Sequence, residues 1–174
     1  MYDAYDRVLD LIEIFRAKDL DEPDRQDIAC AILFGKAKLK PMQQVEALTL
    51  AVDAIFPRVE GESGPRAFDF EQDRDLIYSA FRQAYGVDLE QERGCLSWSD
   101  FLALLAAVPD DTKLAQIINI RLRPVPKPTR HNHEEIAQLL RLKAKYRVKL
   151  TPEEEAQQFQ KGLQKLAESL MNGR

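Results

Sequence analysis

The spacing of apolar residues constrains this chain most, because it follows the period of an α-helix in one segment after another. The first apolar stripe consists of Val8, Leu11, Ile12 and Phe15. These positions are i, i+3, i+4 and i+7, so the side chains share one face of a helix. No segment shows the sustained alternation of apolar and polar residues that marks a half-buried strand. The sequence therefore predicts an all-α fold, with a short hairpin near Val59 or at 89–96 left open.

Prolines and glycines divide the first part of the chain into helices. Pro23 suits the first turn of a second helix, where its missing N–H is not needed, and Gly35 suits the position after the helix end. A third helix is expected between Pro41 and Pro57, with Val45, Leu48, Val52, Ile55 and Phe56 on one apolar face. The turn-rich stretch 59–65 follows it.

The clearest helix start in the chain lies at Ser97. Asp100 stands three residues later, and Leu96 and Phe101 occupy the positions of a hydrophobic staple. Large aromatic side chains dominate burial energetics, so Trp98 and Phe101 are expected to anchor the core.

Three further helix starts are predicted from capping residues. Asp69, with Gln72 three residues on, is expected to cap a fourth helix that ends at Gly86. Asp111 is expected to cap a sixth helix. Asn132, with Glu135, is expected to cap a seventh.

The C-terminal part is expected to form an arm. Three prolines in 124–128 forbid helix and favour a stiff linker. After a capping box at 151–154, the last helix carries a narrow apolar stripe. The stripe consists of Phe159, Leu163, Leu166 and Leu170. We thus expect a compact bundle of about six helices at 1–123, a proline-rich linker at 124–131 and a C-terminal helical arm at 132–174.

Charge is distributed unevenly along the chain. Between 121 and 149, nine basic residues stand against two acids, a net charge of +7, whereas the whole chain carries −4 and the remainder therefore −11. The basic residues are Arg121, Arg123, Lys127, Arg130, Arg141, Lys143, Lys145, Arg147 and Lys149. Those from 141 onward alternate with other residues, which spreads them around a helix, and Tyr146 is the one aromatic residue among them. This pattern favours a solvated face or an acidic protein partner over nucleic acid.

The residues that carry chemistry do not assemble into a motif. His131 and His133 lie two apart at a helix start and do not share a face as an i, i+4 metal-binding pair would. The acids at 69–75 lack the spacing and the glycine of a calcium loop. No phosphate-binding glycine motif occurs. The chain is predicted to be no enzyme and to need no cofactor or metal.

Several features point to the cytoplasm. The first residues contain acids and no apolar run of the kind found in a secretory signal. The longest apolar run, 101–108, falls far short of the roughly 20 residues that cross a bilayer. Cys30 and Cys95 are too few for a disulfide framework.

The middle of the chain resembles a family of tailed-phage and prophage proteins. The similar strings are Asp69 to Phe81, Tyr85 to Leu89, Leu96 to Phe101, Asp110 to Lys113 and Ile117 to Arg121. An N-terminal helix pair between Phe15 and Phe34 and a lysine-rich C-terminal helix are also similar. The family belongs to the tail-morphogenesis region, and its members are typically encoded just before the tape-measure protein.

The resemblance implies a tail assembly chaperone in the cytoplasm of the bacterial host. Its partners would be the tape-measure protein and the tail tube protein, with self-association possible and no membrane. Partner contacts are expected in the C-terminal arm, at Phe159, Leu163, Leu166, Leu170, Arg141 and Lys145. Two alternatives stay open: a tail or connector component retained in the virion, and a nucleic-acid-binding regulator that uses the basic segment.

Overall fold

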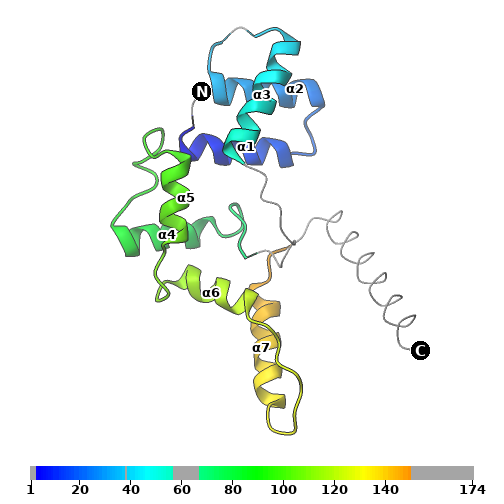
Figure 1. The fold of residues 1–174 in the computed structure, drawn as a ribbon, viewed down its shortest axis with the longest axis vertical. Coiled ribbons are helices and arrows are strands. Elements are labelled where there is room, and N and C mark those ends of the chain that lie inside the picture. The colour runs from blue at the N-terminus through cyan, green and yellow to red at the C-terminus, as the bar shows by residue number, and fades with distance from the viewer. Residues whose placement is uncertain (1–2, 38, 57–66, 150–174) are drawn as a thin grey trace, which may run out of the picture.

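The computed structural model describes residues 3–37, 39–56 and 67–149, and these residues form seven α-helices and no β-strand (Figure 1). The helices are α1 (Tyr5–Arg16), α2 (Glu22–Phe34), α3 (Pro41–Ile55), α4 (Arg74–Tyr85), α5 (Trp98–Ala106), α6 (Lys113–Leu122) and α7 (His133–Tyr146). The predicted all-α fold is confirmed. Residues 89–96 form turns, joined to the N-terminus by one isolated bridge between Ala4 and Ser97.

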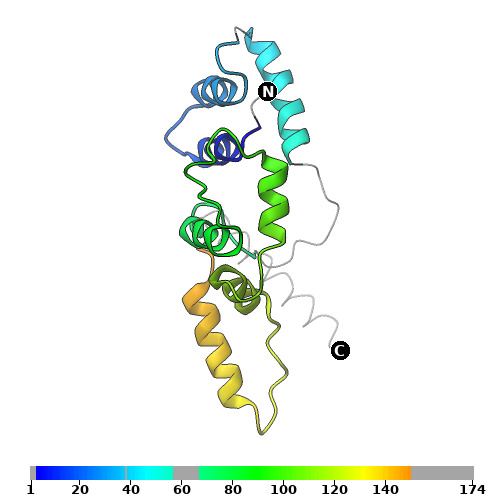
Figure 2. The same ribbon diagram turned by 90° about the vertical axis from the view of Figure 1, so that its left-hand side faces the viewer.

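The helices are arranged along one long axis (Figures 1 and 2). At one end α2 packs on α1 and α3. In the middle α5 contacts α1 and α4, and α6 contacts α4. At the other end α7 contacts α6 and runs away from it along the long axis (Figure 2). Helices α3 and α7 therefore lie at opposite ends of the molecule.

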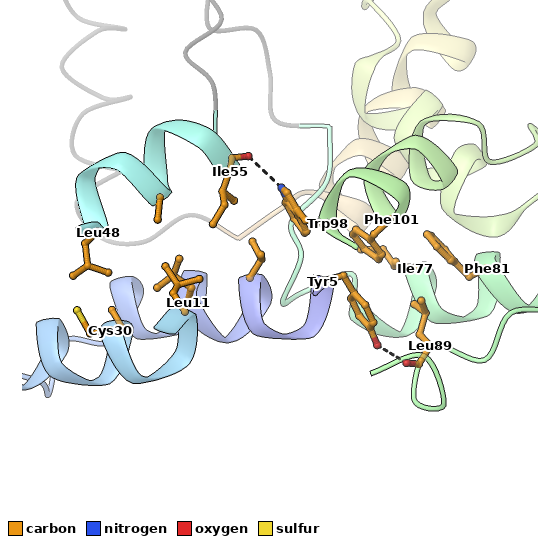
Figure 3. Close-up of a cluster of buried hydrophobic side chains, with 14 of the residues drawn as sticks. Tyr5, Leu11, Cys30, Leu48, Ile55, Ile77, Phe81, Leu89, Trp98 and Phe101 are labelled. Carbon is orange, nitrogen blue, oxygen red and sulfur yellow. Dashed lines mark hydrogen bonds between the residues drawn. The ribbon is translucent and has the colours of Figure 1, made fainter. Parts of the chain in front are cut away.

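A stack of aromatic rings joins the N-terminal helices to the middle of the molecule (Figure 3). Phe101 is fully buried and stacks on Tyr5 at 5.1 Å, on Phe81 at 5.1 Å and on Trp98 at 5.4 Å between ring centroids. The indole Nε1 of Trp98 donates a hydrogen bond to the carbonyl of Ile55 at 3.2 Å. The prediction that Trp98 and Phe101 anchor the core is confirmed.

The Ser97 helix start is confirmed in detail. The Ser97 hydroxyl accepts a hydrogen bond from the Asp100 backbone N–H at 3.1 Å and donates one to the Asp100 carboxylate at 2.7 Å. Leu96 is half-buried against the core beside the buried Phe101. The predicted helix ends at Gly35 and Gly86 are also confirmed, and Gly86 adopts the left-handed conformation (φ 69°) that favours glycine.

Three of the predicted helix caps differ from those in the structure, and the first is Asp69. The Asp69 carboxylate accepts from the backbone N–H groups of Glu71 and Gln72, which closes a turn, and α4 begins only at Arg74. An aspartate stabilises such a turn as readily as a helix start.

At α6 the cap is Thr112 and not its neighbour Asp111, because the Thr112 hydroxyl accepts from Ala115 N–H at 3.3 Å. Asn132 does precede α7, but its side chain bonds back to the linker at Thr129 N–H and the Lys127 carbonyl instead of capping the helix.

Helix α7, placed in the predicted arm, packs on α6. The division into a core domain, a linker and an arm stays a prediction. The expected last helix, with Phe159, Leu163, Leu166 and Leu170, lies outside the described residues, as does the loop at 59–65.

The two cysteines differ in exposure. Cys30 is buried in α2, where desolvation and the nearby Asp27 carboxylate raise the pKa of its thiol. Cys95 is exposed in the turns before α5.

Candidate functional site

The predicted contact residues within the described part lie on the outer surface of α7. Arg141 and Lys145 are both exposed and stand four residues apart, so they share one side of the helix. The Lys145 ammonium lies 5.2 Å from the centre of the Tyr146 ring. Lys143, between Arg141 and Lys145 in sequence, instead turns toward α6, so the basic residues of α7 form no single stripe, as expected.

An internal arginine fixes the position of α7. The Arg121 guanidinium binds both carboxylate oxygens of Asp73, at 2.6 and 2.8 Å, and its Nε donates to the Tyr146 carbonyl at 2.5 Å. In return, the Lys143 ammonium donates to the Arg121 carbonyl at 2.6 Å. Two members of the basic segment, Arg121 and Lys143, are thus structural and not free for a partner.

A second buried carboxylate lies beside the first. The backbone N–H of Asp69 donates to Asp73 at 2.9 Å, and the Asp69 carboxylate pairs with Arg16 of α1 at 3.0 Å. Burial raises the pKa of Asp69, but the hydrogen bonds from Gln72, Arg16 and Glu71 outweigh it and leave the pKa below its ordinary value. This paired network ties α1, the turn before α4, α6 and α7 together.

The exposed side of α7 combines basic and apolar groups. Leu140 is 49% exposed, and Ala137 and Ala144 are exposed beside it. Arg141 and Lys145 border these three residues, since successive residues turn by about 100° around a helix. We call these five residues the α7 surface.

Helix α3 presents an exposed apolar surface that its sequence spacing does not predict. Met42, Val45 and Leu50 are 86%, 54% and 65% exposed. Around the helix, the exposed carboxylates of Glu46 and Asp53 lie between Met42 and Leu50, and the exposed Phe56 lies between Val45 and Met42. We call these six residues the α3 surface.

The five residues predicted to share one apolar face of α3 do share it, but the face is only partly buried. Leu48 and Ile55 are buried, but Val45 and Phe56 are exposed. Helical spacing predicts which residues share a face, but it does not say how wide a strip the neighbouring helix covers. In the same way, Phe15 belongs to the predicted stripe of α1 but is 47% exposed.

A cleft of about 120 Å³ lies between α1 and the region of α4. Leu9, Ile12 and Phe70 are among the apolar residues that line it. Ion pairs join its charged residues, with Arg16 3.8 Å from Glu71 and Arg93 3.9 Å from Asp6. The charged side chains around this cleft are thus largely engaged with one another.

The described ranges contain no group of three or more His, Cys, Asp or Glu residues that could hold a metal ion. None of the seven described helices is both long and apolar enough to cross a bilayer.

Comparison with known proteins shows the family to which the chain belongs. Neither the curated proteins nor the solved structures gave a significant match. The family model described as "Bacteriophage Gp15 protein" matches residues 2–148, which include all seven described helices. Since this match spans most of the 174 residues, the chain belongs to the Bacteriophage Gp15 protein family.

Proposed function

We propose that this protein is a non-enzymatic tail assembly chaperone, which binds the phage tape-measure protein and promotes assembly of the tail tube around it. The observation that carries the proposal is the bacteriophage family match over residues 2–148. It falls on the same part of the chain whose strings resemble tail-morphogenesis proteins encoded before the tape-measure protein.

The physical basis is the protection of apolar helix surface. A tape-measure protein is a very long helical chain with exposed apolar faces, which aggregate unless another protein covers them. An amphipathic helix covers such a face by packing along it. The stripe of Phe159, Leu163, Leu166 and Leu170 is the proposed contact, and Arg141 and Lys145, earlier in the chain, would select acidic flanking residues.

Co-expression with the tape-measure protein from the same phage tests the proposal. The expected result is soluble tape-measure protein with this chain present and aggregated tape-measure protein without it. The variant Leu163→Asp/Leu166→Asp should abolish the protection, because it places two charges in the apolar stripe. The control Gln157→Asp/Gln164→Asp adds the same charges on the opposite side of the expected helix and should protect like the wild type.

Mass spectrometry of purified particles separates a chaperone from a retained structural component. A chaperone leaves as the tube grows, so its peptides should be absent from finished tails. Stoichiometric amounts in the particle, or equal tape-measure solubility with and without this chain, would overturn the proposal.

A further inference from the structure

The α3 surface combines apolar side chains with negative charge. Helix α3 contains two acids, Glu46 and Asp53, and no basic residue within Pro41–Ile55. Within the part of the chain that the structure describes, neither carboxylate takes part in an ion pair. They stand seven residues apart, about 10.5 Å along the helix. Such a surface suits a helix that presents apolar and basic side chains.

The α7 surface has the complementary character. Leu140 projects between the small residues Ala137 and Ala144, which allow another helix to approach closely. Arg141 and Lys145, about 6 Å apart along the axis, border this strip on long side chains that can extend toward carboxylates. From Leu140 to Tyr146 the helix holds three basic residues and no acid.

We propose that the α7 surface of one molecule docks on the α3 surface of a second copy of the chain. Charge and apolar character match across the two surfaces, as complementary interfaces require. The two helices lie at opposite ends of the long axis (Figure 2), so the contact forms between molecules. The proposal does not depend on the proposed chaperone function, because it concerns the purified protein alone.

The contact joins two unlike surfaces, which determines what assemblies result. Copies either add end to end, or two antiparallel copies make the contact twice and close a dimer. Both assemblies contain the same contact. Exposed ion pairs are screened within about 8–10 Å at physiological salt, so association should weaken as salt increases.

Analytical ultracentrifugation of the wild-type protein over a range of concentrations, at low and at high salt, is the first test. We expect a concentration-dependent increase in mass at low salt that falls at least several-fold in affinity at high salt. Glu46→Lys/Asp53→Lys and Arg141→Gln/Lys145→Gln should each abolish the increase. The control is Asp75→Lys/Asp110→Lys, which makes the same charge change at exposed acids of α4 and of the turn before α6. This variant should keep most of the concentration-dependent increase in mass.

Mixing the two surface variants is the decisive experiment. The chain with Glu46→Lys/Asp53→Lys retains its α7 surface, and the chain with Arg141→Gln/Lys145→Gln retains its α3 surface. Neither should associate alone, but an equimolar mixture should form a one-to-one complex. A chain with Glu46→Lys, Asp53→Lys, Arg141→Glu and Lys145→Glu should regain self-association, because both charges are reversed.

Three results would overturn the proposal. The first is a wild-type protein that stays monomeric at low salt and high concentration. The second is a mixture of the two variants, each confirmed as folded by circular dichroism, that gives no complex. The third is a loss of association in the Asp75→Lys/Asp110→Lys control equal to that in the surface variants.

Discussion

Buried charge in the described part of this molecule is gathered at one place. Asp69 and Asp73 are both only 3% exposed and lie four residues apart, and each meets an arginine from another helix. Removing one partner of a buried pair leaves an uncompensated charge, which costs far more than the intact pair contributes. These residues therefore determine how α1, α6 and α7 sit around the turn before α4.

Substitution of Arg121 tests this cost. Arg121→Ala leaves the Asp73 carboxylate unpaired at 4% side-chain exposure, and we expect a loss of about 3–5 kcal/mol in the free energy of unfolding. Arg74→Ala is the control, since Arg74 and its partner Glu90 are 67% and 55% exposed and the loss should stay below about 1 kcal/mol. Urea unfolding measures the loss in both variants. Equal losses would contradict the conclusion that Arg121 compensates the buried charge of Asp73.

The lowered pKa of Asp69 predicts a dependence of stability on pH. The folded pKa lies below the unfolded value of about 3.9, so the ionised carboxylate stabilises the fold above that pH. This contribution is lost as the pH falls through the folded pKa. Asp69→Asn should therefore cost about 1–2 kcal/mol at neutral pH and much less in acid, where the wild-type group is protonated too.

Chemical denaturation at neutral pH and at about pH 2 measures the Asp69 effect. The control Asp111→Asn removes an exposed carboxylate and should change the free energy of unfolding by less than about 0.5 kcal/mol at either pH. A cost for Asp69→Asn that stays constant between the two conditions would show that its charge is not the cause.

At the scale of helices, the local sequence predicts well where helices occur, but it places a helix start wrongly where a contact with a distant part of the chain is involved. Ser97 is correctly predicted because a cap, an acid at the third position and two staple residues all agree. Asp69 has only the capping-box spacing to Gln72, with no apolar residue at the second staple position, and it closes a turn while its carboxylate pairs with Arg16 from a distant helix. Sequence spacing holds no information about such a pairing.

The residues of the two candidate surfaces also differ in how far the sequence could predict them. The exposure of Arg141 and Lys145 follows from their charge and could be predicted. The inward turn of Lys143 and the apolar exposure of α3 could not, because both depend on which helix packs alongside.

Removing the α5 cap should have a defined effect. Ser97→Ala leaves the Asp100 backbone N–H without its acceptor, and we expect a loss of about 1 kcal/mol in the free energy of unfolding. Ser79→Ala is the matched control, because Ser79 lies inside α4, where alanine is the better helix former and no loss is expected. Thermal unfolding of both variants would show the difference, and an unchanged Ser97→Ala protein would contradict the cap.

At the scale of the whole molecule, the aromatic stack lies where the N-terminal helices meet the middle of the chain. Tyr5 of α1 reaches across it, and its hydroxyl donates a hydrogen bond to the Leu89 carbonyl (Figure 3). Burial, and next the charge of Asp6, raise the pKa of that hydroxyl to about 12. The stack thus couples the N-terminal helices to the middle of a long molecule.

This coupling predicts cooperative unfolding. Trp98, the single tryptophan, touches both parts through Ile55 and Phe101. Its fluorescence and the far-ultraviolet circular dichroism should therefore change at the same urea concentration. In Phe101→Ala, which loses about 3–5 kcal/mol of core packing, the common midpoint should move to much lower urea. Two separate midpoints in the wild type would show that the ends unfold independently.

The unequal environments of the two cysteines give this protein a native attachment point for probes. A thiol-directed dye reacts with the exposed Cys95, whereas burial shields Cys30 and disfavours its reactive thiolate. One fluorophore per molecule can thus be placed in the turns before α5. Energy transfer between donor-labelled and acceptor-labelled molecules would then follow assembly in real time without any engineered residue.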